Sequence, residues 1–179
     1  MAMLWRQTWA ADPRAAAMAD RHYSRQHPGT REFAPPGYKV ILVLPGYRAL
    51  WVSQSPKPGI ARADGGSYWY CSLFRNESGR LATVLIRQAI EATLWAWSHW
   101  DLPRDGFVTF INERKIQAPP DGKPYGWTFE DAGFAPLRRT KERDLLMLQL
   151  PREQLALMTP RPAPRLGGGI QMSLMEGIA

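Results

Sequence analysis

The sequence is short of the residues that form disulfides and metal centres. Cys71 is its only cysteine among 179 residues, so an internal disulfide is excluded. That cysteine and the three histidines show no zinc-ligand spacing, and we expect no metal site. No apolar run is long enough to cross a bilayer, and the first residues lack the apolar core of a signal peptide. We therefore expect a cytoplasmic protein without membrane contact.

Acidic residues are also scarce relative to basic ones. The chain has 23 Lys and Arg against 16 Asp and Glu, a formal net charge of +7. Such a charge attracts polyanions, either nucleic acid or a phosphate-rich cofactor, whereas the arginine content alone is also typical of a GC-rich genome. We favour nucleic acid because the basic residues form two clusters, Arg21, Arg25 and Arg31, and then Arg138, Arg139, Lys141 and Arg143.

Composition and length indicate one globular domain. Hydrophobic residues make up 45% and aromatic residues 11% of the chain, enough for a sizeable core. We expect a domain over residues 1–159 and a Pro/Gly-rich tail over 160–179 with little propensity to fold. Apolar residues near the end of that tail would dock on this molecule or on a neighbour, which leaves a homodimer open.

Hydrophobic patterns predict an α+β fold with a mixed sheet. We expect helices over 14–24, 81–97 and 125–132, the first after an Asp-Pro start and the last before a C-cap glycine. We expect strands over 38–44, 47–52, 68–74, 107–111, 134–138 and 143–150.

The junction between the third strand and the long helix is the most informative segment. An aromatic strand ends in the polar turn 75–80, and a helix follows at once. Free N–H groups and the positive end of the helix dipole favour an anion such as pyrophosphate there, with Arg75 and Arg80 beside it. The alternative is an ordinary polar turn.

The element order, with Ala132-Gly133-Phe134 ending the last helix, resembles the GNAT family of N-acetyltransferases over residues 12–150. The resemblance implies a mostly antiparallel sheet with a splayed central strand pair and helices on both faces. It also implies acetyl-CoA or another acyl-CoA as cofactor, bound at Leu73, Phe74, Arg75, Ser78, Gly79, Arg80, Leu81, Ala82 and Thr83.

Two positions depart from the family pattern. The turn motif Gln/Arg-x-x-Gly-x-Gly/Ala falls on residues 77–82, where only Ala82 fits, because Glu77 and Arg80 replace the first residue and the middle glycine. Phe129 stands where many members carry the tyrosine that protonates the departing thiolate. Tyr125, expected one turn earlier on the same helix face, would substitute for it.

More specific features resemble the phage and prophage proteins related to Mom. They are the segment 21–25 followed by a Pro-Pro-Gly loop, the strand–turn 74–77, and Gly126-Trp127. The resemblance implies acyl transfer to an amine of a DNA base, which protects phage DNA from restriction in the host cytoplasm. DNA would then be a partner, contacted by Arg21, Ser24, Arg25, Arg138, Arg139 and Arg143.

Candidate catalytic groups are His22, Tyr23, Tyr70 and Tyr125. His22 follows a helix beside Tyr23, and its imidazole would accept a proton from the amine; the alternative is a histidine that interacts with the helix C-terminus. We expect both residues at the mouth of the splayed strands. Strand alternation puts Tyr68 and Tyr70 on one face and Trp69 on the other. Tyr70 would then be an acid, a substrate-orienting hydroxyl or a core residue.

The sequence thus supports three hypotheses of different kinds. The first is a GNAT-like acyltransferase acting on DNA. The second is a degenerate GNAT-fold module that binds nucleic acid or protein without catalysis, favoured by the poor turn motif and by Phe129. The third is an N-acetyltransferase of small amines, which the arginine clusters make less attractive.

Overall fold

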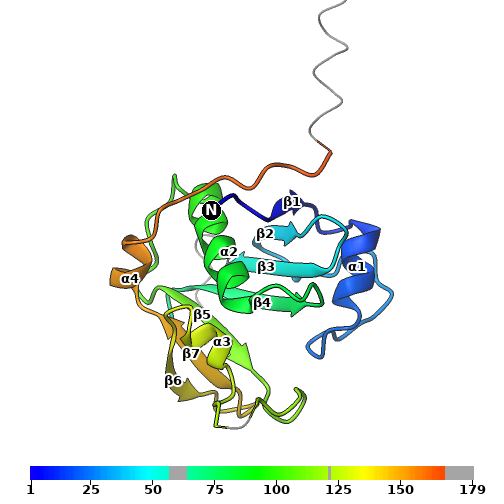
Figure 1. Ribbon diagram of the computed structural model, residues 1–179. Coiled ribbons are helices and arrows are strands. Elements are labelled where there is room, and N and C mark those ends of the chain that lie inside the picture. The colour runs from blue at the N-terminus through cyan, green and yellow to red at the C-terminus, as the bar shows by residue number, and fades with distance from the viewer. Residues whose placement is uncertain (57–63, 121, 168–179) are drawn as a thin grey trace, which may run out of the picture.

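The computed structural model describes residues 1–56, 64–120 and 122–167 and has an α+β architecture (Figure 1). Its described helices are α1 Pro13–Ala19, α2 Ala82–Ala96, α3 Trp127–Glu130 and α4 Arg152–Ala156. Its described strands are β1 Arg6–Thr8, β2 Tyr38–Val43, β3 Ala49–Ser55, β4 Trp69–Asn76, β5 Phe107–Ile111, β6 Ala135–Arg139 and β7 Leu146–Leu150. The α+β prediction is confirmed.

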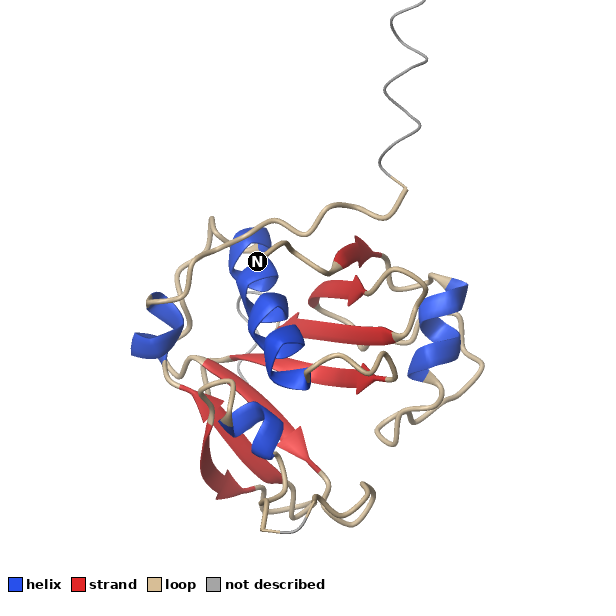
Figure 2. Ribbon diagram, in the orientation of Figure 1, coloured by secondary structure: helices blue, strands red, loops and turns tan. Residues whose placement is uncertain are grey.

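All seven described strands form one sheet in the order β1-β2-β3-β4-β5-β7-β6. Every neighbouring pair is antiparallel except β4 and β5, which run parallel and are linked by α2. Figure 2 shows that β1–β4 and β5–β7 form two halves whose strands diverge after the point where β4 and β5 meet. The sheet is thus mixed but mostly antiparallel, as predicted.

Apolar side chains cover both faces of the sheet because strand residues alternate in direction. On one face Val40, Leu42 and Trp51 pack with buried residues of α2, α3 and α4. On the other face Ile41 and Val43 pack with α1. Helices therefore lie on both faces, and the two cores hold the sheet between them. In the described residues, no helix is both long and apolar enough to span a membrane.

The first and third helices are shorter than the sequence pattern predicts. Asp12 caps α1 by accepting hydrogen bonds from the amides of Arg14 and Ala15, but the helix ends at Ala19 and the chain continues in turns. α3 begins only at Trp127, after Gly126 in the left-handed region at φ 83°. Tyr125 therefore precedes the helix and does not share a helical face with Phe129, which corrects the expected arrangement.

Three features near the chain ends were not expected. β1 adds an edge strand next to β2, and α4 follows β7 directly. Residues 160–167, which we call the strap, lie against β1 and α2, although this segment was expected to belong to an unfolded tail. The apolar end of the expected tail, residues 170–178, lies outside the described residues.

Candidate functional site

The strands β4 and β5 pair at one end only. Their ladder consists of Trp69 with Phe107, Tyr70 with Val108 and Cys71 with Thr109. Beyond it β4 continues to Asn76 beside β3, while β5 continues to Ile111 beside β7. The two strands therefore separate, and we call the wedge between residues 72–76 and residues 110–112 the β4–β5 gap. It is the geometry expected of a splayed central pair.

A β-bulge at Ser72 marks the point where the ladder ends. Val52 is paired with Leu73 and Ser53 with Cys71, so Ser72 is an extra residue without a partner on β3. The bulge changes the alternation: Cys71 packs on the α2 side, whereas Leu73 packs on the α1 side. Because a bulge bends its strand and re-aims the following residues, it turns the end of β4 away from β5.

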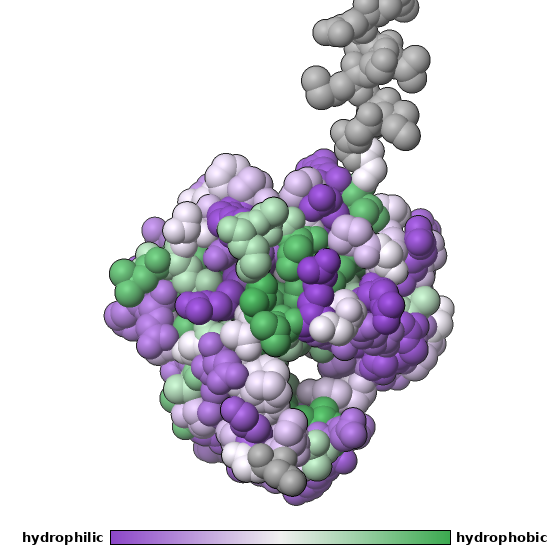
Figure 3. All heavy atoms as spheres, viewed as in Figure 1, coloured by the Kyte–Doolittle hydropathy of each residue, from purple (hydrophilic) through white to green (hydrophobic). Residues whose placement is uncertain are grey.

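Aromatic side chains fill the α2 side at the gap. Phe74 meets Trp51 and Phe129 edge to face, with ring centroids 5.7 and 5.9 Å apart. Phe129 is buried in this cluster and has no polar group to offer a ligand. Figure 3 shows the surface hollowed between the part of the molecule that carries β4 and the part that carries β5–β7. The gap is thus open to solvent and has an apolar wall.

The hydroxyl of Tyr23 reaches across to the β5 side of the gap. It donates to the carbonyl of Phe110 at 3.4 Å and accepts from the amide of Asn112 at 3.5 Å. These two backbone groups flank Ile111 on the edge of β5 that would have faced β4 had the ladder continued. The Tyr23 hydroxyl thus binds the backbone groups that a neighbouring strand would otherwise have bound. Burial raises the pKa of its phenol, so the hydroxyl is protonated at neutral pH.

His22 lies beside Tyr23, with ring centroids 4.4 Å apart. Its Nδ1 is 2.7 Å from the Ser24 hydroxyl and accepts a hydrogen bond from the Ser24 amide. Burial, followed by the nearby Arg75 cation, lowers the pKa of the imidazole to about 4, against a smaller effect of a backbone hydrogen bond with Phe74. The ring is neutral at pH 7 and is a weak proton acceptor.

Glu77 binds the two arginines that flank the gap. Arg21 donates from Nε and Nη2 to the two Glu77 oxygens at 3.1 and 2.8 Å, and Arg75 Nε donates to Oε1 at 2.5 Å. Arg75 also donates to the Arg21 carbonyl, which ties the segment after α1 to the end of β4. We call these three residues the Glu77 clamp. Its single carboxylate holds both guanidinium groups that the sequence assigned to a ligand and balances one of their two positive charges.

The Glu77 clamp predicts a pH-dependent contribution to stability. Hydrogen bonds from Arg21 and then Arg75 lower the pKa of Glu77 from 4.5 to about 2. A lowered carboxyl pKa stabilises the fold above pH 4.5, and this contribution is lost as the pH falls toward 2. We expect Glu77→Gln to lower the free energy of unfolding by about 1 kcal/mol at pH 7, because the pair is partly exposed.

Urea unfolding of both proteins between pH 7 and pH 2.5 measures this contribution. The difference between them should shrink below pH 4.5. Glu142→Gln, at an exposed position outside the clamp, serves as the control and should show little difference at any pH. A Glu77→Gln difference that stays constant down to pH 2.5 would contradict the assignment.

The turn after β4 is organised by Asn76. Its Oδ1 accepts from the amide and the hydroxyl of Ser78, and its Nδ2 donates to the carbonyl of Arg80. Gly79 has φ 72° with open space around its Cα, so the turn uses a conformation that glycine adopts without strain. The strand thus leads into α2 through a compact, closed turn.

α2 begins without a side-chain cap. Leu81 occupies the N-cap position, its side chain is 75% exposed, and no acidic residue lies in the first turn. The amides of Ala82, Thr83 and Val84 have no acceptor among the described residues. Free N–H groups at a helix N-terminus attract anions, and α2 is long enough for its dipole to add to them. Five residues, 77–81, separate the end of β4 from the start of α2.

Tyr70 lies on the α1 side of the sheet near the paired end of β4. Its ring contacts Tyr68 and Phe110, with centroids 6.4 Å apart in both cases, while Trp69 packs on the α2 side. The expected alternation is therefore confirmed. Cys71 is buried, and burial raises the pKa of its thiol, so it is a core residue rather than a nucleophile.

Most arginines assigned to DNA have partners within the chain. Arg25 is only 9% exposed and holds the 20–32 loop closed through Asp20 and Thr30. On β6, Arg138 lies 3.6 Å from Asp64. Further ion pairs join Arg139 to Glu113 and Asp144. Arg143 is exposed and has no ion pair with a described residue. Arg21 belongs to the Glu77 clamp, and Ser24 is paired with His22.

Sequence analysis missed the residues that shape the gap. The Ser72 bulge follows from pairing with β3 and leaves no local signal. Glu77 entered the sequence analysis only as a departure from the turn motif, yet it pairs with Arg21, which is 56 positions away. The turn at Asn76 was recognisable in the sequence, since an Asn two residues before a Ser favours a turn closed by the Asn side chain.

Comparisons with protein families, with curated proteins and with solved structures found no match.

Proposed function

We propose that the protein is a GNAT-like N-acyltransferase that moves an acetyl or related acyl group from acyl-CoA to an amine. The observation that supports this most directly is the parallel pair β4–β5, which parts at the Ser72 bulge immediately before the turn and α2. In the GNAT family such a splayed pair and the following turn hold the acyl-CoA. The strand order and helices on both faces agree with that arrangement.

The gap offers what an acyl-CoA arm needs. Residues 73–76 have no strand partner on the side of β5, so an extended amide chain can add to that edge. The phosphates would lie at the free amides of Ala82, Thr83 and Val84. Arg80 is exposed beside them, whereas Arg75 stays bound to Glu77. Phosphate binding in this proposal therefore depends on backbone amides more than on Arg75.

In the proposed reaction, the acceptor amine lies against the thioester carbonyl of acyl-CoA. The amine nitrogen forms a C–N bond to the carbonyl carbon, and amides of β4 near Leu73 and Phe74 stabilise the oxyanion. The C–S bond then breaks, the sulfur takes the proton of the Tyr23 phenol, the amine proton passes to water, and water returns a proton to the Tyr23 phenolate. Tyr23 is assigned the acid role because its protonated hydroxyl stands in the gap. His22, with a pKa of about 4, orients the segment rather than serving as a strong base.

Isothermal calorimetry with acetyl-CoA, CoA and pantetheine tests the proposal. We expect binding of both CoA species and much weaker binding of pantetheine, because pantetheine lacks the phosphates that the start of α2 would hold. If neither acetyl-CoA nor CoA gives heat of binding at millimolar concentration, the proposal is overturned.

DNA is the acceptor that we propose for the acyl group, on the basis of the net charge of +7 and the resemblance to Mom-related proteins. Binding of duplex DNA should fall with salt, with a log–log slope of about −0.9 for each phosphate neutralised. Replacing Arg138, Arg139 and Arg143 by Gln should flatten this slope without changing CoA affinity. Equal slopes for the wild type and the triple variant would favour a small amine as acceptor.

A binding module without catalysis is the second candidate, and two observations favour it. The Glu77 clamp engages both arginines beside the gap and balances one of their two charges, and the buried Phe129 cannot protonate a thiolate. DNA binding without any CoA binding would support this candidate over the enzyme.

A further inference from the structure

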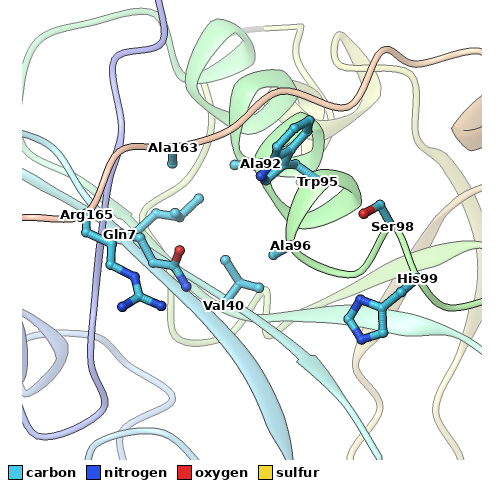
Figure 4. Close-up of a pocket in the computed structure, with 10 residues that line it drawn as sticks. Gln7, Val40, Ala92, Trp95, Ala96, Ser98, His99, Ala163 and Arg165 are labelled. Atoms are coloured by element: carbon cyan, nitrogen blue, oxygen red, sulfur yellow. The ribbon is translucent and has the colours of Figure 1, made fainter.

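A cavity lies on the α2 face of the sheet, toward the β1 edge and away from the β4–β5 gap. Its volume is about 490 Å³, and it opens between the C-terminal half of α2, the β1–β2 edge and the strap. Figure 4 shows Gln7 and Arg165 on one side of this space and Ser98 and His99 on the other. Strands β2 and β3 separate it from β4 in the sheet order. None of its lining residues belongs to the site described above.

The strap holds the cavity in a fixed shape. The Gln7 amide donates to the Pro164 carbonyl, and the Leu166 amide donates to the Gln7 carbonyl, both at 2.9 Å. At its other end Arg161 forms an ion pair with Glu91 on α2 at 3.0 Å. The segment 163–165, which lines the cavity, is therefore fastened to a strand on one side and to a helix on the other. A ligand would meet a site that is already formed.

Three polar side chains around the cavity have no internal partner. The side-chain amide of Gln7, the Ser98 hydroxyl and the Arg165 guanidinium form no hydrogen bond or ion pair with a described residue. None of the described lining residues is a carboxylate, so none of them balances the Arg165 cation. A convergent cation and neutral hydrogen-bonding groups are suited to an anion that carries further polar atoms.

The cavity also has an apolar part. Val40 and Leu42 on β2 are buried beneath it, and Ala92 and Ala96 on α2 contribute small side chains. Trp95 is 53% exposed at the same place, although an indole of this size is usually more buried. An exposed indole that lines the same cavity as a guanidinium gives a surface on which the flat ring of an anion can stack.

We propose that this cavity binds a small anion with one flat ring, of about the size of a nucleoside monophosphate. The ring stacks on Trp95 above the apolar floor, Arg165 binds the phosphate or carboxylate, and Gln7 and Ser98 bind the remaining polar atoms. The volume of about 490 Å³ accommodates such a molecule but not a folded dinucleotide or CoA. The proposal does not depend on acyltransferase activity.

Calorimetry with adenosine monophosphate and with indole-3-acetate tests this proposal. We expect at least one to bind, and the tighter one identifies phosphate or carboxylate as the anion. Adenosine and inorganic phosphate alone should each bind at least tenfold more weakly than adenosine monophosphate. Excess CoA should not displace the ligand if the two sites are separate.

Two exposed positions provide the variants. Arg165→Gln should weaken binding at least tenfold, and Trp95→Ala should weaken it several-fold, while Arg152→Gln on α4 is the matched control and should bind as the wild type does. All three residues are exposed, so thermal unfolding should confirm that the variants remain folded. Failure of both probes at 10 mM, equal affinity of Arg165→Gln and the wild type, or displacement by CoA would overturn the proposal.

Discussion

Leu81→Asp should make the protein more stable and at the same time weaken its binding of CoA. Leu81 stands at the uncapped start of α2 and is 75% exposed, so its removal costs little packing. An aspartate there would accept hydrogen bonds from the free amides of Thr83 or Val84, which stabilises a helix by about 1 kcal/mol. The same carboxylate would occupy the amides assigned to the cofactor phosphates and repel those phosphates.

We expect the affinity for CoA to fall on the order of 10- to 100-fold, since like charges about 4 Å apart in a partly exposed site interact by about 1–4 kcal/mol. Thermal unfolding measures the gain in stability, and calorimetry measures the loss of affinity. Leu81→Asn caps without charge and should give a similar gain in stability with a smaller loss of affinity. If Leu81→Asp binds CoA as the wild type does, the phosphates do not lie at the start of α2.

Tyr23→Phe should reduce acyl transfer about 100-fold or more while leaving CoA affinity almost unchanged. The substitution removes only the hydroxyl in the β4–β5 gap, and loss of a general acid typically costs a factor of 10² to 10⁴ in rate. Because burial raises the pKa of this phenol, the rate of the wild type should not fall between pH 7 and pH 9 through loss of the acid. Release of the CoA thiol at saturating acetyl-CoA, with duplex DNA as acceptor, measures the effect.

The variant also separates catalysis from folding. Its two hydrogen bonds are long, so we expect a loss of no more than about 1 kcal/mol in the free energy of unfolding. Tyr125→Phe, in the turn before α3, is the control that tests the alternative acid. A larger loss of rate in Tyr125→Phe than in Tyr23→Phe would transfer the acid role to Tyr125.

Local patterns predicted six of the seven described strands but neither β1 nor the details of strand pairing. The strand Phe107–Ile111 was predicted at its exact bounds, because a short apolar run between a glycine turn and a polar segment leaves little freedom. The strand Arg6–Thr8 was missed, since three polar residues carry no periodic signal, and it exists by pairing with β2 and the strap. Such a strand forms because residues far apart in the sequence pair with one another, and a single sequence does not reveal that pairing.

The sequence predicted the location of the candidate site better than it predicted the chemistry of the site. The strand–turn–helix junction follows from local signals, such as the aromatic run of β4 and the turn residues that close on Gly79. The pairing of Arg21 and Arg75 with Glu77 does not, because it depends on Arg21 and Glu77 meeting across 56 positions. The low pKa of His22 depends likewise on burial in the folded chain. The number of basic residues in the sequence therefore overstates the positive charge that the folded protein offers to a ligand.

The two ends of the sheet differ in how they avoid pairing with another chain. At the β1 end, the strap forms backbone hydrogen bonds with Gln7 and so occupies the strand edge. At the β6 end, Pro136 has no amide hydrogen, the register shifts next to it, and Arg138 and Arg139 are exposed. Exposed charge, proline and irregular register all disfavour strand addition. Any dimer of this protein should therefore form through faces or helices rather than by extending the sheet.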